Sequence, residues 1–258
     1  MNLDLAAVKE ALGTVLSMPL SLYRDDAVDR RLAAWLAGQP EGPLEALLVR
    51  LRRDLALQDD LVASLTIHVT GWRRDAEGFD ALRDEILPLL VERFGILRIW
   101  SAGCADGAEI MSVAGVAEEA GLLESCLLTA TDISLPTLAL AERGSFHPSA
   151  QQGLPETWKA GRGTLNEDGS WQPPARWRDR IRYQVHDLLG ELPLADQHLI
   201  LCRNVTIHMR DQARDEVWRK LGRALPRGGM LFVGAAEHLP AGGDHGCRPL
   251  RPFFYEKA

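Results

Sequence analysis

The stretch from Leu97 to Asp132 constrains the fold more than any other part of the chain. A short apolar run, Leu97 to Trp100, leads into a loop with glycines at positions 103 and 107, and a helical pattern and a second apolar run follow it. The second run ends on Asp132. Short apolar runs separated by a glycine turn and a helix-length segment indicate one strand, turn, helix, strand unit.

The residues of the turn predict a nucleoside site. Gly103 lets the chain turn sharply off the strand, and Gly107, which lacks a Cβ, lets a ligand lie against backbone N–H groups where the helix begins. Asp132 stands twenty-five positions beyond Gly107, at a strand tip where a carboxylate can bind both hydroxyls of a ribose. We therefore expect an adenosine-bearing ligand; a purely structural turn is the alternative.

The turn argues against a dinucleotide. The dinucleotide pattern is G-x-G-x-x-G, whereas this turn reads Gly-Cys-Ala-Asp-Gly, with Asp106 where a pyrophosphate would be repelled. A cationic sulfonium with an amino-acid tail is compatible with Asp106 and with the nearby Glu109. These residues point to S-adenosylmethionine.

Charge and cysteine content exclude other classes of function. The net charge of -7 and the isoelectric point of about 5.5 argue against a nucleic-acid partner, which would need a basic face. The cysteines at 104, 126, 202 and 247 form no C-x-x-C pair, so buried reduced thiols are expected and no metal site. His245 and Cys247 alone are too few ligands for zinc.

The chain carries no sign of a membrane segment. No apolar run approaches the length of a membrane span, and Met1 leads directly into an amphipathic, acid-bearing stretch. We expect a cytoplasmic protein without membrane insertion, and a monomer, although the sequence does not define the oligomeric state.

Residues 1 to 66 are expected to be helical, with a break at Pro40 to Pro43. The apolar stripes are Leu5, Val8, Leu12 and Leu16, then Val28, Leu32, Trp35 and Leu36, then Leu47, Leu48 and Leu51. Six arginines lie among them: Arg24, Arg30, Arg31, Arg50, Arg52 and Arg53. We interpret these arginines either as a solvated face or as a docking surface for an acidic helical partner.

The remaining segments extend the α/β pattern. Helices are predicted over Glu77 to Phe94, with a kink at Pro88, over Leu135 to Arg143 and over Asp211 to Leu225. Strands are predicted over Ile181 to His186, Leu199 to Cys202, Met230 to Val233 and Phe253 to Glu256. Between them, Asp168-Gly169 is a hairpin signal, so we expect an inserted antiparallel element, with a disordered loop as the alternative.

Four stretches, in order, resemble the motifs of the chemotaxis receptor methyltransferase (CheR) family. Thr66 to Asp75 resembles T-x-N-V-T-x-F-F-R-D, and Arg98 to Ser112 resembles R-I-W-S-A-G-C-S-T-G-E-E-P-Y-S. Leu201 to Met209 resembles F-C-R-N-V-L-I-Y-F, and Gly228 to Glu237 resembles G-G-x-L-F-L-G-H-S-E. The resemblance covers nearly the whole chain. It implies methyl transfer from S-adenosylmethionine to receptor glutamates.

The resemblance also implies site residues. Arg74 would lie closest to the transferred methyl group and the incoming carboxylate, and His208 stands where the family has a substrate-orienting Tyr. The implied cofactor-binding residues are His68, Thr70, Arg74, Gly103, Gly107, Glu109, Asp132, Asp187, Leu188, Arg203, Asn204 and Val205. Among them Asp132 would hold the ribose and Glu109 the cofactor's ammonium group.

The chain departs from the family pattern at several positions. These are His68 for Asn, Trp72-Arg73 for Phe-Phe, Ala108 for the first Glu, Ile110-Met111 for Pro-Tyr, and His208 for Tyr. His208 either donates a hydrogen bond to the carboxylate in place of the Tyr or is a tolerated filler. The departures leave two alternatives to the enzyme: a non-catalytic signalling module that keeps the fold, and a small-molecule methyltransferase.

We therefore expect a class I, Rossmann-like S-adenosylmethionine-dependent methyltransferase domain with a small antiparallel insert, preceded by an all-α domain. The expected divisions are residues 1–66, helical; 67–80, a connector that contributes to the cofactor site; and 81–258, with the insert at about 145–180. The expected activity is methyl esterification of glutamates on the cytoplasmic helical domain of a chemoreceptor-like protein, with S-adenosylhomocysteine as the second product.

Overall fold

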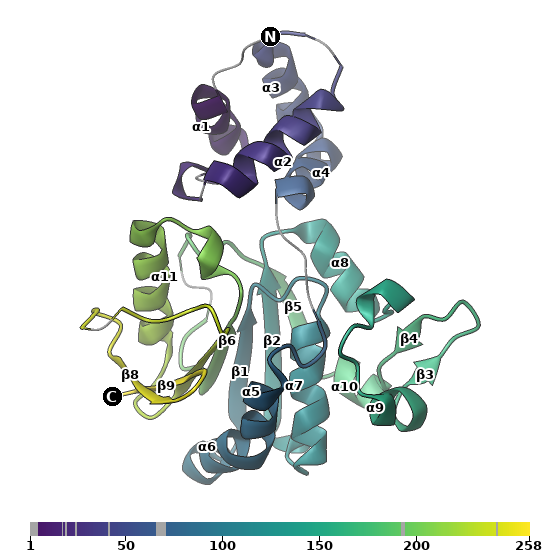
Figure 1. The fold of residues 1–258 in the computed structure, drawn as a ribbon, viewed down its shortest axis with the longest axis vertical. Helices are drawn as coiled ribbons and strands as arrows, with labels where there is room; N and C mark the ends of the chain where they lie inside the picture. Colours follow the sequence, from purple (N-terminus) through teal and green to yellow (C-terminus); the bar gives the residue numbers. More distant parts are fainter. Residues whose placement is uncertain are drawn as a thin grey trace.

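The computed structural model describes residues 5–16, 18, 20–23, 25–40, 42–65, 71–191, 194–240 and 242–258, without the side chains of residues 25–27. A mixed β-sheet with helices on both faces forms the body, and a bundle of helices lies over one end of it (Figure 1). The expected α/β fold preceded by an all-α region is thus confirmed.

Seven strands form the main sheet in the order β5-β2-β1-β6-β7-β9-β8. Five run parallel: β1 (Leu97–Ala102), β2 (Cys126–Asp132), β5 (Ile181–Val185), β6 (Leu199–Cys202) and β7 (Met230–Val233). The strand β9 (Phe254–Lys257) is antiparallel to β7, and β8 (Cys247–Arg251) pairs with β9. The sequence did not predict β8, because this edge strand is largely exposed and contains Pro249.

Two hydrophobic cores cover the two faces of the sheet, as alternation along a strand requires. In β1, Leu97 and Ile99 join one core, and Trp100 and Ala102 join the other. The first face is covered by α5 (Ala76–Ala81), η2 (Leu82–Ile86), α6 (Leu87–Phe94) and α7 (Ala108–Glu119). The second is covered by α11 (Asp211–Ala224). Further helical segments are α8 (Leu135–Arg143) and the 3₁₀ turns η3 (Leu123–Ser125), η4 (Pro148–Ala150) and η5 (Thr206–His208).

The helix predicted over Glu77 to Phe94 is continuous but contains the π-helical turn η2 just before Pro88. Proline has no N–H, and its ring clashes with the carbonyl four residues earlier, here that of Asp84. A π turn relieves this conflict by widening the helix locally. The kink predicted at Pro88 stays a prediction, and the structure shows a π-helical turn just before this residue.

The N-terminal helices are α1 (Leu5–Leu16), η1 (Leu20–Leu22), α2 (Asp25–Ala37), α3 (Leu44–Arg53) and α4 (Leu55–Leu65). They share a core of their own that includes Leu12, Leu32 and Leu51, as the apolar stripes predicted. Trp35 adds a hydrogen bond from its Nε1 to Oδ2 of Asp60 at 2.7 Å. The domain boundary at residue 66 stays a prediction, since residues 66–70 lie outside the described residues.

The predicted insert is confirmed. It contains α9 (Glu156–Gly161), the hairpin β3 (Thr164–Leu165) and β4 (Trp171–Gln172), and α10 (Ala175–Arg178). The hairpin turn has Gly169 at φ 78°, and Oδ1 of Asp168 accepts the N–H of Ser170 at 2.9 Å. Trp158, Trp171 and Trp177 are fully buried and pack edge to face beneath the hairpin.

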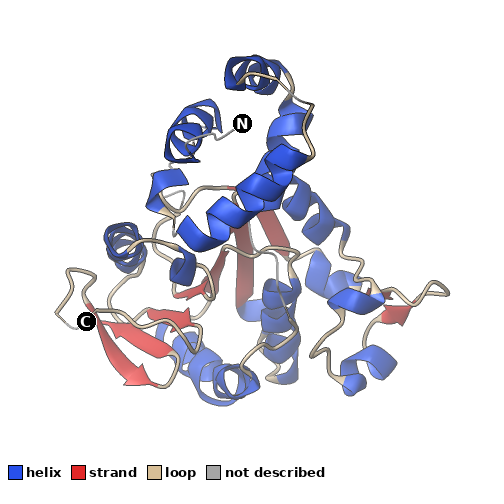
Figure 2. Cartoon of the chain, turned by 45° about the horizontal axis from the view of Figure 1, so that its top comes forward, coloured by secondary structure: helices blue, strands red, loops and turns tan. Residues whose placement is uncertain are grey.

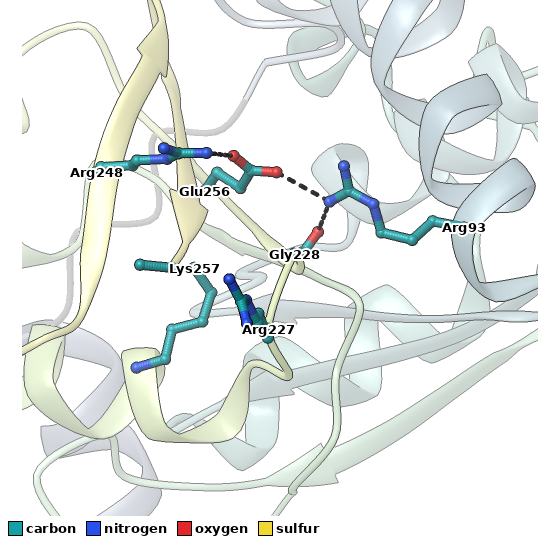
Figure 3. A pocket seen from close by; sticks show the side chains of 7 residues that line it. Arg93, Arg227, Gly228, Arg248, Glu256 and Lys257 are labelled. Atoms are coloured by element: carbon teal, nitrogen blue, oxygen red, sulfur yellow. Dashed lines mark hydrogen bonds and ion pairs between the residues drawn. The ribbon is translucent and has the colours of Figure 1, made fainter.

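An ion-pair network lies at the end of the sheet where the parallel strands begin, opposite the end that the helical bundle covers. Glu256 accepts from Arg93 at 3.0 Å and from Arg248 at 2.8 Å, which ties α6 to the C-terminal hairpin (Figure 3). A pocket of about 340 Å³ lies beside this network, lined also by Arg227 and Lys257. Because Arg93 and Gly228 precede β1 and β7, the pocket lies away from the C-terminal strand ends.

No helix in the described part of the chain combines the length and the apolar character that a membrane crossing requires.

Candidate functional site

The C-terminal ends of the parallel strands meet at the edge of the sheet that the helical bundle faces (Figures 1 and 2). The register pairs Ala102 with Thr131, Asp132 with Val185, and Cys202 with Val233. Ligands of open α/β sheets bind at this edge. The strand tips and loops there carry Gly103, Gly107, Asp132, Asp187, Leu188, Arg203, Asn204 and Val205, so the structure brings these predicted residues together.

The glycine turn after β1 is held against β2. The N–H groups of Gly103 and Cys104 both donate to the carbonyl of Thr131, at 2.8 and 2.9 Å. Gly103 has φ 86°, and a Cβ on it would lie 2.6 Å from Cγ2 of Val205. A Cβ on Gly107, at φ 87°, would lie 3.0 Å from Cβ of Ala141. Close packing within the protein is therefore a sufficient reason for both glycines.

Asp132 joins the glycine turn to the tip of β2. Its Oδ2 accepts the N–H of Ala105 at 2.9 Å, and its Oδ1 accepts the N–H of Ser134 at 3.0 Å. The residue is only 8% exposed. Each carboxylate oxygen can accept a second hydrogen bond, so Asp132 can hold the turn and still bind a hydroxyl group.

Asp187 follows β5 on the far side of β2. Its Oδ1 accepts the N–H of Leu189 at 2.9 Å, and burial raises the pKa of its carboxyl group. Leu188 is buried in the second core beside it. Leu188 can contact an apolar ring of a ligand while the neighbouring carboxylate of Asp187 binds its polar groups.

Arg203 is the centre of a buried polar network. Its Nη2 donates to the carbonyl of Arg74 at 2.5 Å and to Oδ2 of Asp75 at 2.8 Å. Its Nη1 lies 3.3 Å from Oε2 of Glu109. The guanidinium also lies 4.5 Å from the ring centre of Phe232. Arg203 thus links the connector, the start of α7 and the tip of β6.

Glu109 is satisfied within the protein. Its Oε1 accepts from the hydroxyl of Ser101 at 2.7 Å, and its Oε2 pairs with Arg203. Burial raises the pKa of the Glu109 carboxyl group, against the opposing effects of Arg203 and Ser101. The cation paired with Glu109 in this structure is the guanidinium of Arg203.

The two residues expected to be catalytic lie in the connector and in the loop after β6. Arg74 is exposed, and its carbonyl is held by Arg203. His208 is half-buried in the 3₁₀ turn η5, in the loop that follows β6. The predicted residues His68 and Thr70 lie outside the described residues.

Most residues that depart from the family motifs are buried or bound to other protein groups in the structure. Trp72 is 1% exposed, donates its Nε1 to the carbonyl of Ala150 at 3.1 Å and packs edge to face on Phe146. Arg73 pairs with Asp80 at 2.5 Å. Ala108, Ile110 and Met111 are buried in the first core. The contacts of Trp72 with Ala150 and Phe146 therefore hold the connector against the insert.

Sequence reasoning missed three residues at this edge. Glu237, buried in the loop after β7, accepts backbone hydrogen bonds from the loop after β6. Asp75 pairs with Arg203. Both residues stood within or at the end of matched motifs, so a signal existed. Tyr23 had none: it packs on both the helical and the second sheet core, and burial, with the nearby charges of Asp187 and Asp132, raises the pKa of its phenol.

The sequence of this chain matches a known protein family. The family described as CheR methyltransferase, SAM binding domain, matches residues 68–249. The chain belongs to the CheR methyltransferase family. A chemotaxis protein methyltransferase of Listeria monocytogenes is 30% identical over 243 residues, covering 94% of this chain and 92% of that protein. Chemotaxis protein methyltransferase 1 of Pseudomonas aeruginosa is 28% identical over 258 residues, covering 95% and 93%.

A solved structure overlaps this CheR-family chain less completely than these two relatives do. A SAM-dependent methyltransferase of Methanosarcina mazei covers 54% of this chain and 51% of its own, at 16% identity and a TM-score of 0.35. That score is too low to add to the assignment.

The cofactor of this CheR-family chain is S-adenosylmethionine. The acceptor groups at the strand ends fit it, because the carboxylates of Asp132 and Asp187 can accept from hydroxyl and ammonium groups. Among the described residues, no three His, Cys, Asp or Glu side chains gather into a metal site. The four cysteines are free thiols, and all but Cys247 are buried, as expected.

Proposed function

We propose that this chain transfers the methyl group of S-adenosylmethionine to glutamate side chains of a chemoreceptor-like signalling protein, forming methyl esters in chemotaxis-type adaptation. The observation that carries the proposal is the convergence of the glycine turn, Asp132, Asp187 and the loop after β6 at one edge, beside Arg74 of the connector. The names of the relatives from Listeria and Pseudomonas support the link to chemotaxis.

The proposed roles follow the position of each group. Asp132 holds the ribose, and Asp187 and Asn204 bind the adenine and the amino-acid tail from the two sides. The full proposed cofactor set is His68, Thr70, Arg74, Gly103, Gly107, Glu109, Asp132, Asp187, Leu188, Arg203, Asn204 and Val205. Within this set, Arg203 and Glu109 support the site mainly through each other and through the connector, because their polar atoms already bind protein groups.

The reaction needs placement more than base strength. The unperturbed pKa of a glutamate is about 4.3, so the attacking carboxylate is already ionised at neutral pH. S-adenosylmethionine supplies an electrophilic methyl group on its sulfonium. Arg74 orients the carboxylate by its charge, and His208 donates a hydrogen bond to it, so that one carboxylate oxygen faces the methyl group. Positioning of this kind can contribute about 7 to 11 kcal/mol.

The partner is proposed from the exposed arginines. Arg50, Arg52 and Arg53 lie exposed in the last turn of α3, and Arg30 is exposed on α2. Together with Arg31 and Arg24, of which Arg24 lies outside the described residues, they suit the acid-rich surface of a helical receptor domain. We also propose the division into residues 1–66, 67–80 and 81–258, and action in the cytoplasm.

Titration calorimetry with S-adenosylmethionine and S-adenosylhomocysteine tests the cofactor site. The wild type should bind both with Kd near 1 μM, about -8 kcal/mol, and Asp132→Ala should abolish binding. Asp132 also holds the glycine turn, so thermal melting must show that the variant is folded. Asp244→Ala, at an exposed loop residue, should bind like the wild type.

A receptor fragment tests the substrate. Incubation with the cytoplasmic helical fragment of a chemoreceptor and methyl-labelled cofactor should yield base-labile label, which replacing the fragment's glutamates by glutamine removes. Cofactor binding without label on such fragments would contradict the proposed substrate and leave a small-molecule methyltransferase. Failure of the folded wild type to bind the cofactor would leave a non-catalytic signalling module.

A further inference from the structure

Glu237 is a carboxylate buried among five donors. The residue is 3% exposed. Its Oε1 accepts the N–H groups of Val205 and Thr206, at 3.0 and 2.9 Å, and the hydroxyl of Thr206 at 2.9 Å. Its Oε2 accepts the N–H groups of Asn204 and Gly234, at 2.5 and 3.1 Å. A carboxylate with this many donors is fixed in place.

Three of these donors are the consecutive backbone N–H groups of Asn204, Val205 and Thr206. Consecutive N–H groups that converge on one anion form a backbone nest. Asn204 has φ 58°, a left-handed conformation that Asn tolerates better than most residues other than glycine. In this conformation the N–H of Asn204 points at the carboxylate of Glu237.

The carboxylate of Glu237 also completes a ring of contacts between three segments. Arg203, which precedes the nest, binds Asp75 of the connector. Asp75 in turn accepts the N–H of Ala235, at 3.4 Å, in the loop that carries Glu237. The loop after β6 is therefore held from β7 and from the connector at once.

We propose that Glu237 is a positioning residue for the cofactor: it holds Asn204 and Val205 in the conformation that binds S-adenosylmethionine, acting through the loop. This inference rests on the proposed function, because it takes Asn204 and Val205 as cofactor contacts. The nest gives the loop its binding conformation before the ligand arrives, which avoids an ordering cost on binding.

Glu237→Gln is the sharpest variant, because it keeps the shape of the side chain while it removes the negative charge and turns one acceptor oxygen into a donor group. With the amide oxygen at the Oε1 position, the amide NH₂ group faces the N–H groups of Asn204 and Gly234, which donate and cannot accept. If the loop then holds its binding conformation about one tenth of the time, the apparent Kd for the cofactor rises about tenfold.

Glu256→Gln is the matched control. Glu256 is another buried glutamate. It lies at the opposite end of the sheet, where it pairs with Arg93 and Arg248 (Figure 3). This control should lower the melting temperature and leave the Kd for S-adenosylhomocysteine unchanged. A general loss of stability would affect both variants alike, whereas a positioning role separates them.

The experiment measures the Kd of S-adenosylhomocysteine by calorimetry, and the KM values for cofactor and receptor fragment, in wild type, Glu237→Gln and Glu256→Gln. We expect Glu237→Gln to raise the Kd and the cofactor KM about tenfold and to change the receptor KM less than about twofold. A folded Glu237→Gln that binds like Glu256→Gln overturns the inference. Absence of binding by the wild type overturns the proposed function and this inference with it.

A second variant covers the case in which Glu237→Gln does not fold. Thr206→Val removes only the hydroxyl that donates to Oε1 of Glu237. We expect it to raise the Kd about threefold, since four of the five donors remain. An unchanged Kd in folded Thr206→Val then overturns the inference.

Discussion

Nη2 of Arg203 lies 2.8 Å from Oδ2 of Asp75, a residue 128 positions earlier in the chain. The same nitrogen binds the carbonyl of Arg74 at 2.5 Å, so the backbone of the proposed catalytic arginine is held by a residue at the tip of β6. The side chain of Arg203 is 1% exposed. One buried cation therefore sets the position of the connector relative to the sheet.

Removing this cation should be strongly destabilising. Arg203→Met leaves Glu109 buried without its charge partner, and breaking a buried pair in this way costs about 3 to 5 kcal/mol. Urea unfolding measures the loss. Arg182→Met, at an exposed residue of β5, should change the free energy of unfolding by less than about 0.5 kcal/mol. Equal stability of the two variants would show that the network contributes nothing.

Arg74 and His208 should affect turnover more than cofactor binding. Because Arg74 orients the carboxylate by charge, Arg74→Ala should lower kcat about 100-fold, and Arg74→Lys should recover part of it. His208→Tyr, which keeps a hydrogen-bond donor, should stay within about tenfold of the wild type, whereas His208→Phe should fall further. The assay is methyl transfer to a receptor fragment. If His208→Phe turns over like the wild type, His208 is a filler.

Gly115 in α7 should not tolerate alanine. A Cβ there would lie 2.3 Å from Cη2 of Trp158, a fully buried ring whose Nε1 donates to Glu119 at 2.6 Å. Overpacking should lower the free energy of unfolding by about 1 to 3 kcal/mol, although Gly→Ala in a helix otherwise gains about 0.5 to 1 kcal/mol. Gly161→Ala in α9, where nothing lies within 4 Å, is the control and should be neutral or stabilising. Matching melts for both variants would contradict the packing of the insert on α7.

His198 should make stability fall on mild acidification. Its Nδ1 accepts the N–H of Arg98 at 3.1 Å, and its ring stacks on Phe94. Burial and then the charge of Arg98 lower the pKa of His198, against Asp196 and a backbone contact at Ile96. The unfolded ring titrates near a pKa of about 6.5. The stability contribution is therefore full above that pH and is lost as the pH falls through the lower folded-state pKa.

Unfolding free energies between about pH 7.5 and 5 in wild type and His198→Asn test this sign. Asparagine accepts the same hydrogen bond and does not titrate, so the variant should show a flatter pH dependence. The exposed His147→Asn should run parallel to the wild type. A His198→Asn curve parallel to the wild type, with the same acid loss, would contradict the assignment.

Much of the fold follows from local patterns. The lengths of the apolar runs predict the strands from Leu97 onward, and the two glycines with Asp132 predict a turn and an acid at one edge, because strand ends in an α/β sheet converge. The charge partners did not follow. Spacing places Glu109 near the turn but cannot show that its cation is Arg203, which lies 94 positions later.

Contacts between segments that are distant in the chain were equally out of reach. The role of Glu237 depends on β7 lying beside β6, and its five donors are mostly backbone groups, which leave no mark in a sequence. Tyr23 reaches the strand ends only because the helical bundle lies over them. The edge strand β8 is set by pairing with β9 and has no apolar alternation to reveal it.

The backbone of the helical bundle is joined to the segment after β6. Tyr23 forms an antiparallel bridge with Met209, and the N–H of Arg210 donates to the carbonyl of Leu22 at 2.9 Å. A partner bound to α2 and a cofactor bound at the tip of β6 therefore act on two segments that these backbone hydrogen bonds join. Thermodynamic linkage makes that influence mutual: whatever factor the partner applies to the cofactor's affinity, the cofactor applies in equal measure to the partner's.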